Sequence, residues 1–326
     1  MSDVYRGGIL PDVITLGEPL VEFIDKHKKG SFTQLSEFVG PFPSGAPAIF
    51  AVAVARLKVS SGLVGVVGKD EFGTILLNRL RIDGVDISYM RVAENYTTGT
   101  AFVTYSPSGS RKFIFHLRHA AAGQLSPEDV DETFIKSAKF LHIMGSALSL
   151  SQSSREACYK ALEIAVEHGV KISLDPNVRP ELLGIEEIRR ICKPVLENAY
   201  LVLPSGEEAM MLTGGKSPDE ACRILIDLGI KMVALKRGAE GSTIYTEGEV
   251  LPIPAFKVEE VEPTGAGDIY DGAFIVGLVR GWPLSRVGLF ANAAGAISVT
   301  RIGPIDSCPY LEEVERLIST QNTIKF

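Results

Sequence analysis

The sequence predicts an α/β protein in which a mostly parallel β-sheet carries helices on both faces, with a second, small β-sheet beside it. Three observations support this fold class. Strand-like and helical segments alternate over residues 140–300, two strand-like runs flank a turn at residues 106–110, and 326 residues that are 45% hydrophobic suffice for a large core. Strands separated by helices of about 10–15 residues form βαβ units, which make a sheet parallel.

In the first half of the chain we expect buried strands at residues 12–17, 63–67 and 89–92, and helices at residues 48–57 and 72–82. Segments 18–40 and 97–117 differ, because each holds short strand-like runs around a turn. Strand-like runs at residues 100–105 and 112–117 flank the turn at 106–110, whose sequence Ser-Pro-Ser-Gly-Ser is typical of β-hairpins. These two segments do not fit a parallel layer, and we expect them to form the small sheet as a lid.

The second half of the chain alternates more regularly. Expected strands cover residues 140–144, 171–175, 200–203 and 232–235, and a hairpin-like segment covers 242–250. Expected helices cover residues 153–168, 185–198, 206–212, 218–228, 269–280 and 284–300. This order places helices on both faces of one sheet.

Composition and charge argue against several classes of function. A net charge of −7 and a pI near 5.4 disfavour nucleic acid or an acidic membrane surface as a partner, because both select for basic patches. The cysteines have no metal-ligand spacing, so we expect buried reduced thiols at Cys158, Cys192, Cys222 and Cys308. Since there is no signal peptide and no run of about 18 apolar residues, we expect a cytoplasmic protein.

The chain is organised around the segment Glu262-Pro-Thr-Gly-Ala-Gly-Asp268, which leads into a helix. Its glycines leave a turn with almost no side chain, so that backbone N–H groups can close directly on an anion. The start of the helix favours the same negative charge. Local composition leaves two interpretations of Asp268 open, a helix cap or a base beside a phosphoryl group.

Other nucleotide and catalytic motifs fail. A P-loop ending at Gly68-Lys69 would have Leu63 in place of its first glycine and Asp70 in place of its hydroxyl residue. A dinucleotide fingerprint at Gly265 would have Tyr270 in place of its third glycine. No G-x-S-x-G occurs, and His142 lies in an apolar strand, where a core histidine is expected.

Six segments occur in an order that is specific as a set: Gly17-Glu-Pro19, Ser44-Gly-Ala-Pro-Ala48, Val64-Gly-Val-Val-Gly-Lys-Asp70, Asp175-Pro-Asn-Val-Arg179, Lys236-Arg-Gly-Ala-Glu-Gly241 and Pro263-Thr-Gly-Ala-Gly-Asp268. Over nearly its whole length the chain therefore resembles ribokinase-like carbohydrate kinases of the phosphofructokinase B type. Within them it is most similar to 2-keto-3-deoxygluconate kinases, on Gly17-Glu-Pro-Leu-Val21, Leu174-Asp-Pro-Asn-Val-Arg179 and Ser205.

The resemblance implies one kinase domain over residues 1–326, with a three-layer α/β/α core and a lid from segments 18–40 and 97–117. It implies ATP as phosphoryl donor and Mg²⁺ on its phosphates. Asp268 would be the base, and Gly265, Ala266 and Gly267 would bind the transferring phosphate. Glu208 would hold Mg²⁺ through water, against the alternative of an ordinary first-turn carboxylate. Nucleotide-binding residues would be Asn177, Ser205, Glu208, Lys236, Arg237, Gly238, Gly241, Gly265, Gly267 and Asn292.

For the acceptor, the resemblance implies Gly45, Tyr105, His116, Arg118, Arg179 and Asp268. The two arginines suit a sugar acid, because the planar guanidinium pairs with a carboxylate through two hydrogen bonds. Alternatively, Arg118 is a strand-end charge and Arg179 a surface salt bridge. The chain departs from the family at Ser44 (often Gly), Ile49 (often Asn) and Glu262 (often Asp); Glu22 is the nearest acid to another frequent Asp.

The sequence thus predicts an ATP-dependent sugar kinase with 2-keto-3-deoxygluconate as the leading acceptor. A fructokinase, or another hexose or nucleoside kinase of this fold, is the alternative acceptor assignment. A catalytically inactive sugar sensor is the alternative from another class, although the intact Gly265-Ala-Gly-Asp268 argues against it. Expected partners are the sugar and ATP, with neither nucleic acid nor membrane, and a second copy of the chain paired through the lid.

Overall fold

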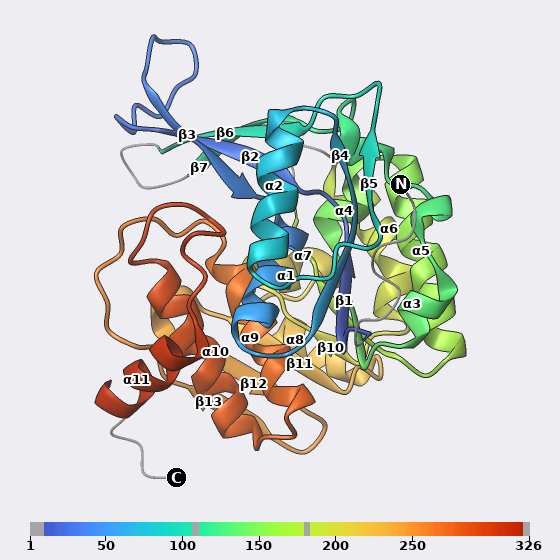
Figure 1. Ribbon diagram of the computed structural model, residues 1–326. Helices are drawn as coiled ribbons and strands as arrows, with labels where there is room; N and C mark the ends of the chain where they lie inside the picture. The colour runs from blue at the N-terminus through green and yellow to red at the C-terminus, as the bar shows by residue number, and fades with distance from the viewer. Residues whose placement is uncertain (1–9, 106–110, 179–182, 322–326) are drawn as a thin grey trace.

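The computed structural model describes residues 10–105, 111–178 and 183–321. Its main sheet has nine strands in the order β13-β12-β11-β10-β9-β8-β1-β4-β5, with helices on both faces (Figure 1). Seven strands are parallel: β1 (Val13–Leu16), β4 (Ser61–Gly68), β5 (Met90–Ala93), β8 (Phe140–Met144), β9 (Lys171–Asp175), β10 (Leu201–Val202) and β11 (Met232–Lys236). The hairpin β12 (Ser242–Tyr245) and β13 (Val250–Ile253) extends the sheet antiparallel at one edge. The predicted fold class is confirmed.

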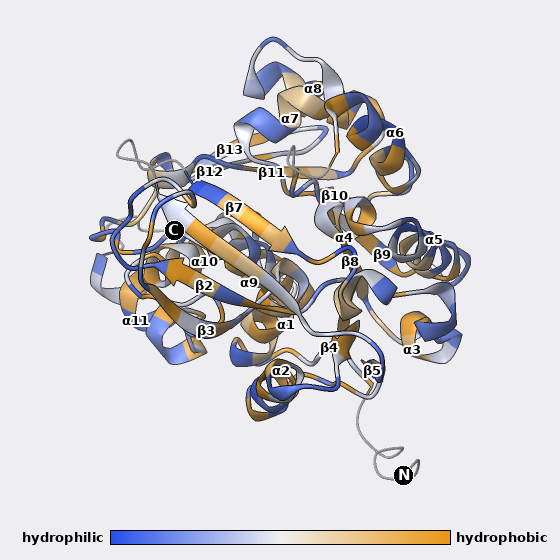
Figure 2. Cartoon of the chain, turned by 90° about the horizontal axis from the view of Figure 1, so that it is seen from above, coloured by the Kyte–Doolittle hydropathy of each residue, from blue (hydrophilic) through white to orange (hydrophobic). Residues whose placement is uncertain are grey.

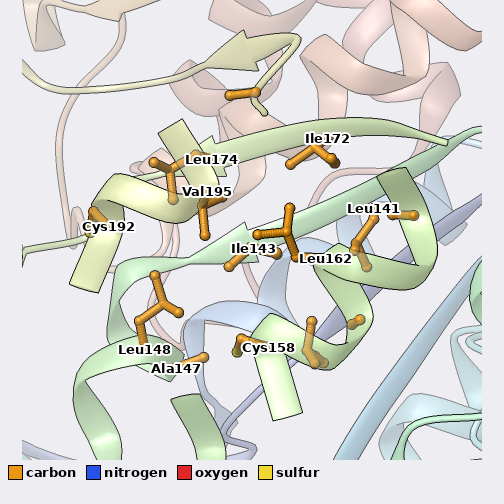
Figure 3. Packing of buried hydrophobic residues seen from close by; sticks show 14 of the residues in the cluster. Leu141, Ile143, Ala147, Leu148, Cys158, Leu162, Ile172, Leu174, Cys192 and Val195 are labelled. Atoms are coloured by element: carbon orange, nitrogen blue, oxygen red, sulfur yellow. The ribbon is translucent and has the colours of Figure 1, made fainter. Parts of the chain in front are cut away.

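The inner parallel strands are mostly apolar and buried, as is typical of a sheet whose two faces are both covered by helices. One face packs on α1 (Ala46–Arg56), α2 (Glu71–Ile82), α9 (Ala266–Val279), α10 (Leu284–Ser298) and α11 (Leu311–Gln321). The other packs on α3 (Glu132–Lys136), α4 (Gly145–Leu150), α5 (Gln152–Glu167), α6 (Ile185–Leu196), α7 (Gly206–Thr213) and α8 (Pro218–Asp227). Figure 3 shows the second core, where Leu162 of α5 and Val195 of α6 meet Ile143 of β8.

The four cysteines and His142 lie inside these cores, as predicted. All four cysteines are buried free thiols. His142 is fully buried, bonds the Ser173 hydroxyl through Nδ1 at 2.9 Å and stacks on Phe50. Burial lowers its pKa to about 3, so it is a neutral core histidine.

The second sheet has the strand order β3-β2-β6-β7. Its strands are β2 (Leu20–Asp25), β3 (Phe38–Ser44), β6 (Gly99–Tyr105) and β7 (Arg111–His116). Strands β2 and β6 pair in parallel and join the two hairpin segments, which are far apart in the sequence. In Figure 2, which looks down on the molecule, these strands cross in front of α1 and α9. The predicted small sheet is present, and β3 extends beyond the predicted segment to Ser44.

The structure differs from the prediction at three further points. Helix α9 begins at Ala266 rather than residue 269, so the glycine-rich turn forms its first turn. Helix α1 begins at Ala46, because Pro47 is well suited to a first helical turn. Helices α3, α4 and α11 were not predicted. Within the described residues no helix is long and apolar enough to cross a membrane.

Candidate active site

We keep the name lid for the second sheet, β3-β2-β6-β7. A pocket lies between this sheet and the amino-terminal ends of α1 and α9. Such helix ends present N–H groups without intrahelical partners, and their dipoles favour an anion. The lining residues come from the lid, from both helix starts and from α4. They are Glu18, Leu20, Glu22, Ser44, Gly45, Ala46, Ile49, Arg111, Phe113, Phe115, Leu117, Ser146, Leu150, Thr264, Gly265 and Asp268.

Asp268 is buried in the first turn of α9 and faces this pocket. The helix cap position belongs to Gly265, whose φ of +85° is a left-handed conformation suited to glycine. Asp268 is therefore not the N-cap residue. Asn177 Nδ2 donates to Asp268 Oδ1 at 3.2 Å and to Asp175 Oδ2 at 3.2 Å. The Asp268 carboxylate is thus held by a side chain from the end of β9.

Next to Asn177, the buried carboxylates of Asp175 and Asp271 form a cluster with the partly buried Lys236. Lys236 Nζ is 3.1 and 3.2 Å from the Asp271 oxygens and 3.3 Å from Asp175 Oδ1. Burial opposes the charged form of Lys236, but the two carboxylates raise its pKa above the ordinary value. Lys236 likewise lowers the pKa of Asp175 against the effect of burial, whereas burial and the Asp175 charge raise that of Asp271. A continuous chain of contacts therefore runs from Asp271 through Lys236, Asp175 and Asn177 to Asp268.

Lys236 also adds positive charge to the first turn of α9. A methyl group built on Gly267 would lie 3.6 Å from Lys236 Nζ, so the ammonium group stands directly beside this turn. The turn formed by Gly265, Ala266 and Gly267 presents few side-chain atoms, and its N–H groups lie at a helix start. This arrangement can bind a phosphate beside the Asp268 carboxylate.

Glu208 lies in the first turn of α7, near the same end of the sheet. Its Oε2 accepts from Ser205 N at 2.7 Å and its Oε1 from Val178 N at 3.0 Å, which closes a capping box with Ser205. Within the described part of the chain, no group of three or more His, Cys, Asp or Glu side chains is arranged to hold a metal ion.

The family of the chain follows from comparison with known proteins. A family model described as pfkB family carbohydrate kinase matches residues 11–310. The chain belongs to this family. A curated relative, probable fructokinase-7 of Arabidopsis thaliana, is 35% identical over 324 residues, covering 94% of this chain and 92% of the relative. Probable fructokinase-2 of the same plant is 34% identical, covering 91% and 92%.

Solved structures agree with this assignment. An Escherichia coli protein named provisionally as Ribokinase II, in complex with ATP and Mg²⁺, matches with a TM-score of 0.89 and 42% identity, over 95% of this chain and 99% of that one. A Vibrio cholerae fructokinase with fructose, ADP and a calcium ion matches with a TM-score of 0.82 and 27% identity, over 94% and 99%. The predictions of an ATP-dependent sugar kinase, with ATP and Mg²⁺ as cofactors, are confirmed. The curated relatives carry the name fructokinase, so the comparisons support the family and not specifically its 2-keto-3-deoxygluconate branch.

Several residues that were predicted to bind the nucleotide make hydrogen bonds or close contacts within the protein. Asn292 Nδ2 donates to the carbonyl groups of Ile253 and Pro254 at 3.1 and 3.0 Å. A Cβ on Gly241 would lie 2.2 Å from that Ile253 oxygen, so only glycine fits there. Gly238, in the same turn, has a φ of +56°.

Arg237 is also engaged within the protein. Its guanidinium donates to Thr243 Oγ1 at 2.9 Å, to Asp219 Oδ1 at 2.9 Å and to the Tyr245 hydroxyl at 3.2 Å. These contacts tie the turn after β11 to β12 and to the start of α8. Any part that Arg237 plays in nucleotide binding stays a prediction.

The structure separates the predicted acceptor residues. Gly45 and Asp268 line the pocket. The Tyr105 hydroxyl points instead at Glu262 and Thr264. His116 and Arg118 line a neighbouring groove beside the start of α2, and Arg118 Nε donates to Leu150 O at 3.3 Å. Arg179 lies outside the described residues.

Strand alternation explains why His116 is not among the pocket-lining residues. On β7 the pocket is lined by Arg111, Phe113 and Phe115, which are alternate residues, whereas His116 occupies the opposite phase. Arg111 was missed because the strand was expected to begin at residue 112. Ser146, at the start of α4, was missed because no sequence motif marks it. The alternation of residues along β7 could have predicted that Arg111 lies on the same side as Phe113 and Phe115.

Gly45 permits a test of the pocket wall. Its φ is +107°, and a Cβ there would lie 2.2 Å from Glu18 O. We expect Gly45→Ala to displace Glu18, to raise the KM for the acceptor and to destabilise the fold by about 1–3 kcal/mol. Steady-state kinetics and thermal unfolding measure both effects.

Gly169→Ala is the matched control, because Gly169 has a φ of +69° but no atom within 4 Å of a built Cβ. It should show backbone strain with an unchanged KM. The same KM in both variants would contradict the role of Gly45 in shaping the pocket.

Proposed function

We propose that this kinase transfers the γ-phosphate of ATP to a hydroxyl group of a neutral ketose, with fructose as the first candidate. The supporting observation is the charge of the pocket, which three carboxylates line: Glu18, Glu22 and Asp268. Carboxylates accept hydrogen bonds from sugar hydroxyls but repel the carboxylate of a sugar acid. Among the described lining residues the only cation is Arg111. The fructokinase names of the relatives support the same acceptor.

In this proposal Asp268 accepts the proton of the attacking hydroxyl as the new oxygen–phosphorus bond forms and the bond between the γ-phosphorus and the bridging oxygen breaks, which releases ADP. Asn177 orients its carboxylate by donating to Oδ1. The N–H groups at Gly265, Ala266 and Gly267 bind the phosphoryl oxygens, and Lys236 contributes positive charge beside them. The lid covers the pocket and excludes water, which otherwise competes as acceptor.

The residues near Glu208 fit a magnesium ion held mainly by the nucleotide. Mg²⁺ usually keeps several waters and binds one or two carboxylates besides substrate phosphates, and Glu208 is a carboxylate oriented by two backbone N–H donors. When bound, the ion neutralises developing charge on the phosphates. Ser205 and Val178 fix the orientation of Glu208 for this role.

The competing acceptor is 2-keto-3-deoxygluconate. That prediction came from the sequence similarities to 2-keto-3-deoxygluconate kinases and gave Arg118 and Arg179 the role of binding the acid, but Arg118 lines the neighbouring groove. Arg118 does not line the pocket itself, and its Nε donates to Leu150 O at the edge of the pocket. Among the described lining residues, only Arg111 could pair with a sugar carboxylate, against the three carboxylates there. The keto-acid acceptor therefore stays a prediction with less support than the neutral ketose.

A coupled ADP-release assay over ketohexoses, aldohexoses, nucleosides and sugar acids tests the proposal. We expect fructose or another neutral ketose to give the highest kcat/KM. We also expect Arg118→Ala to change this value by less than about twofold, because its side chain lies outside the pocket. Preference for 2-keto-3-deoxygluconate, together with a loss of roughly 10-fold or more in Arg118→Ala, would contradict the neutral ketose.

We also propose that the lid pairs with a second copy of the chain. The lid exposes large apolar side chains, including Leu35, Val39 and Ile114, and a partner that covered them would remove apolar area from water.

A further inference from the structure

The lid and the segment that enters the anion-binding turn share one carboxylate oxygen. Tyr105, the last residue of β6, donates its hydroxyl to Glu262 Oε1. The same Oε1 accepts the backbone N–H of Thr264 at 2.9 Å, and Thr264 directly precedes Gly265. Tyr105 and Glu262 are 5% and 3% exposed, so water competes little for these bonds.

A second contact joins the same two parts of the molecule. Arg111 is the cross-strand partner of Tyr105 in the β6–β7 ladder. Its guanidinium approaches Thr264 Oγ1 at 3.5 Å, and the Tyr105 hydroxyl lies 3.4 Å from that oxygen. The end of β6 and the start of β7 therefore both contact residues 262–264.

The start of this segment is hydrogen-bonded to the end of α10. The N–H groups of Val261 and Glu262 both donate to Val299 O, at 2.7 and 3.1 Å. Ile269 N donates to Gly265 O at 2.9 Å within α9. The Glu262 side chain thus lies between the helix layer and the lid, and the anion-binding turn begins directly after Thr264.

We infer that Tyr105 and Glu262 are positioning residues, which lock the lid to residues 262–264 and thereby set the anion-binding turn for phosphoryl transfer. We call this contact the lid clasp. The inference rests on the proposed function, in which the turn binds the transferring phosphate. Phosphoryl transfer depends on alignment, and a displacement of about 1 Å can cost roughly 100-fold in rate.

Two features favour a clasp over ordinary packing. Burial and the charge of Glu262 raise the pKa of Tyr105 above its usual value, which agrees with a hydroxyl that donates to this carboxylate. Residue 262 is glutamate, and its side chain is one methylene longer than aspartate. Aspartate at this position would keep the charge but would fall short of the Tyr105 hydroxyl unless the lid moved.

The test is a double-mutant cycle of Tyr105→Phe and Glu262→Asp, measured with the acceptor that the wild-type kinase uses. Each single variant should lower kcat by roughly 10- to 150-fold, the range for a hydrogen bond to a charged group. The KM for ATP should stay unchanged. The double variant should lose no more than the larger single effect, because both changes break one contact. Tyr96→Phe is the matched control, since Tyr96 is 42% exposed and precedes the lid strand.

Hydrogen exchange supplies a readout that does not need activity. In Tyr105→Phe, the backbone amides of residues 262 and 264–266 should exchange faster, although the substitution lies on the lid; Tyr96→Phe should leave their exchange unchanged. Unchanged exchange there would overturn the clasp, as would single effects on kcat that multiply in the double variant. A rise in the KM for the sugar with an unchanged kcat would also overturn the clasp, because it would indicate that Tyr105 contacts the sugar instead. If the wild-type kinase prefers a sugar acid, the proposed acceptor fails, but the cycle is run with that acid and still decides the clasp.

Discussion

Asp268→Asn is expected to lower kcat by a factor of roughly 10²–10⁴, the usual contribution of a positioned general base. Asparagine keeps the size of the side chain and an oxygen that can accept from Asn177 Nδ2, the present partner of Asp268 at 3.2 Å. It cannot take a proton from the sugar hydroxyl. ATP affinity and the unfolding midpoint should therefore stay close to wild type, while turnover falls. Steady-state kinetics, calorimetric titration with ATP and thermal unfolding separate these effects.

Asp227→Asn is the matched control, because Asp227 is an exposed carboxylate near the end of α8. It should leave kcat unchanged. Wild-type turnover in Asp268→Asn would contradict the base and leave Asp268 as a first-turn carboxylate that interacts with the dipole of α9.

The sequence predicts the main sheet well because its strands carry their own signal. Residues of β4 and β8 are buried throughout, and such continuous apolar runs between helices are typical of a parallel sheet. The turn at Gly265 was also predictable, since a left-handed residue before a helix calls for glycine. Both features depend only on residues that are close together in the sequence.

Some helices lacked such a signal, and others were overlooked. All six residues of α4 are buried, so it shows no polar face and no amphipathic period. Helix α11, by contrast, has Leu311, Val314 and Ile318 at helical spacing, and this pattern was available. The start of β7 was predicted one residue too late, and Arg111 was therefore left out of the strand.

The buried charges could not be predicted at all. Asp175 ends β9, Lys236 ends β11 and Asp271 lies in α9, so the cluster exists only once three distant segments are packed. The same holds for Tyr105 and Glu262, which are 157 residues apart in the chain. A resemblance to a family can place a residue near a site, but the partner of its side chain follows from the packing of this chain.

Lys236→Met is expected to destabilise the kinase by about 3–5 kcal/mol, because it leaves buried carboxylates without their cation. The pKa of Asp175 is lowered in the fold, so this group contributes stability above its unfolded value of 3.8 that is lost as pH falls through the folded value. Lys236, whose pKa is raised, contributes stability that is fully present below its unfolded value of 10.5. The difference between wild type and variant should therefore be largest near neutral pH. Urea unfolding at pH 7 and pH 4 measures it.

The gap should narrow at pH 4, because the carboxyl groups of Asp175 and Asp271 in the variant, lacking a cation, take up protons more readily than in the wild type. Lys231→Met is the matched control: Lys231 is exposed just before β11, and its loss should change the free energy of unfolding by less than about 0.5 kcal/mol. Adding Asp271→Asn to Lys236→Met should recover part of the loss, since one buried charge is then removed. A loss below about 1 kcal/mol that is equal at both pH values would mean that water screens this cluster, and that Lys236 does not hold Asp175 and Asn177 in place for Asp268.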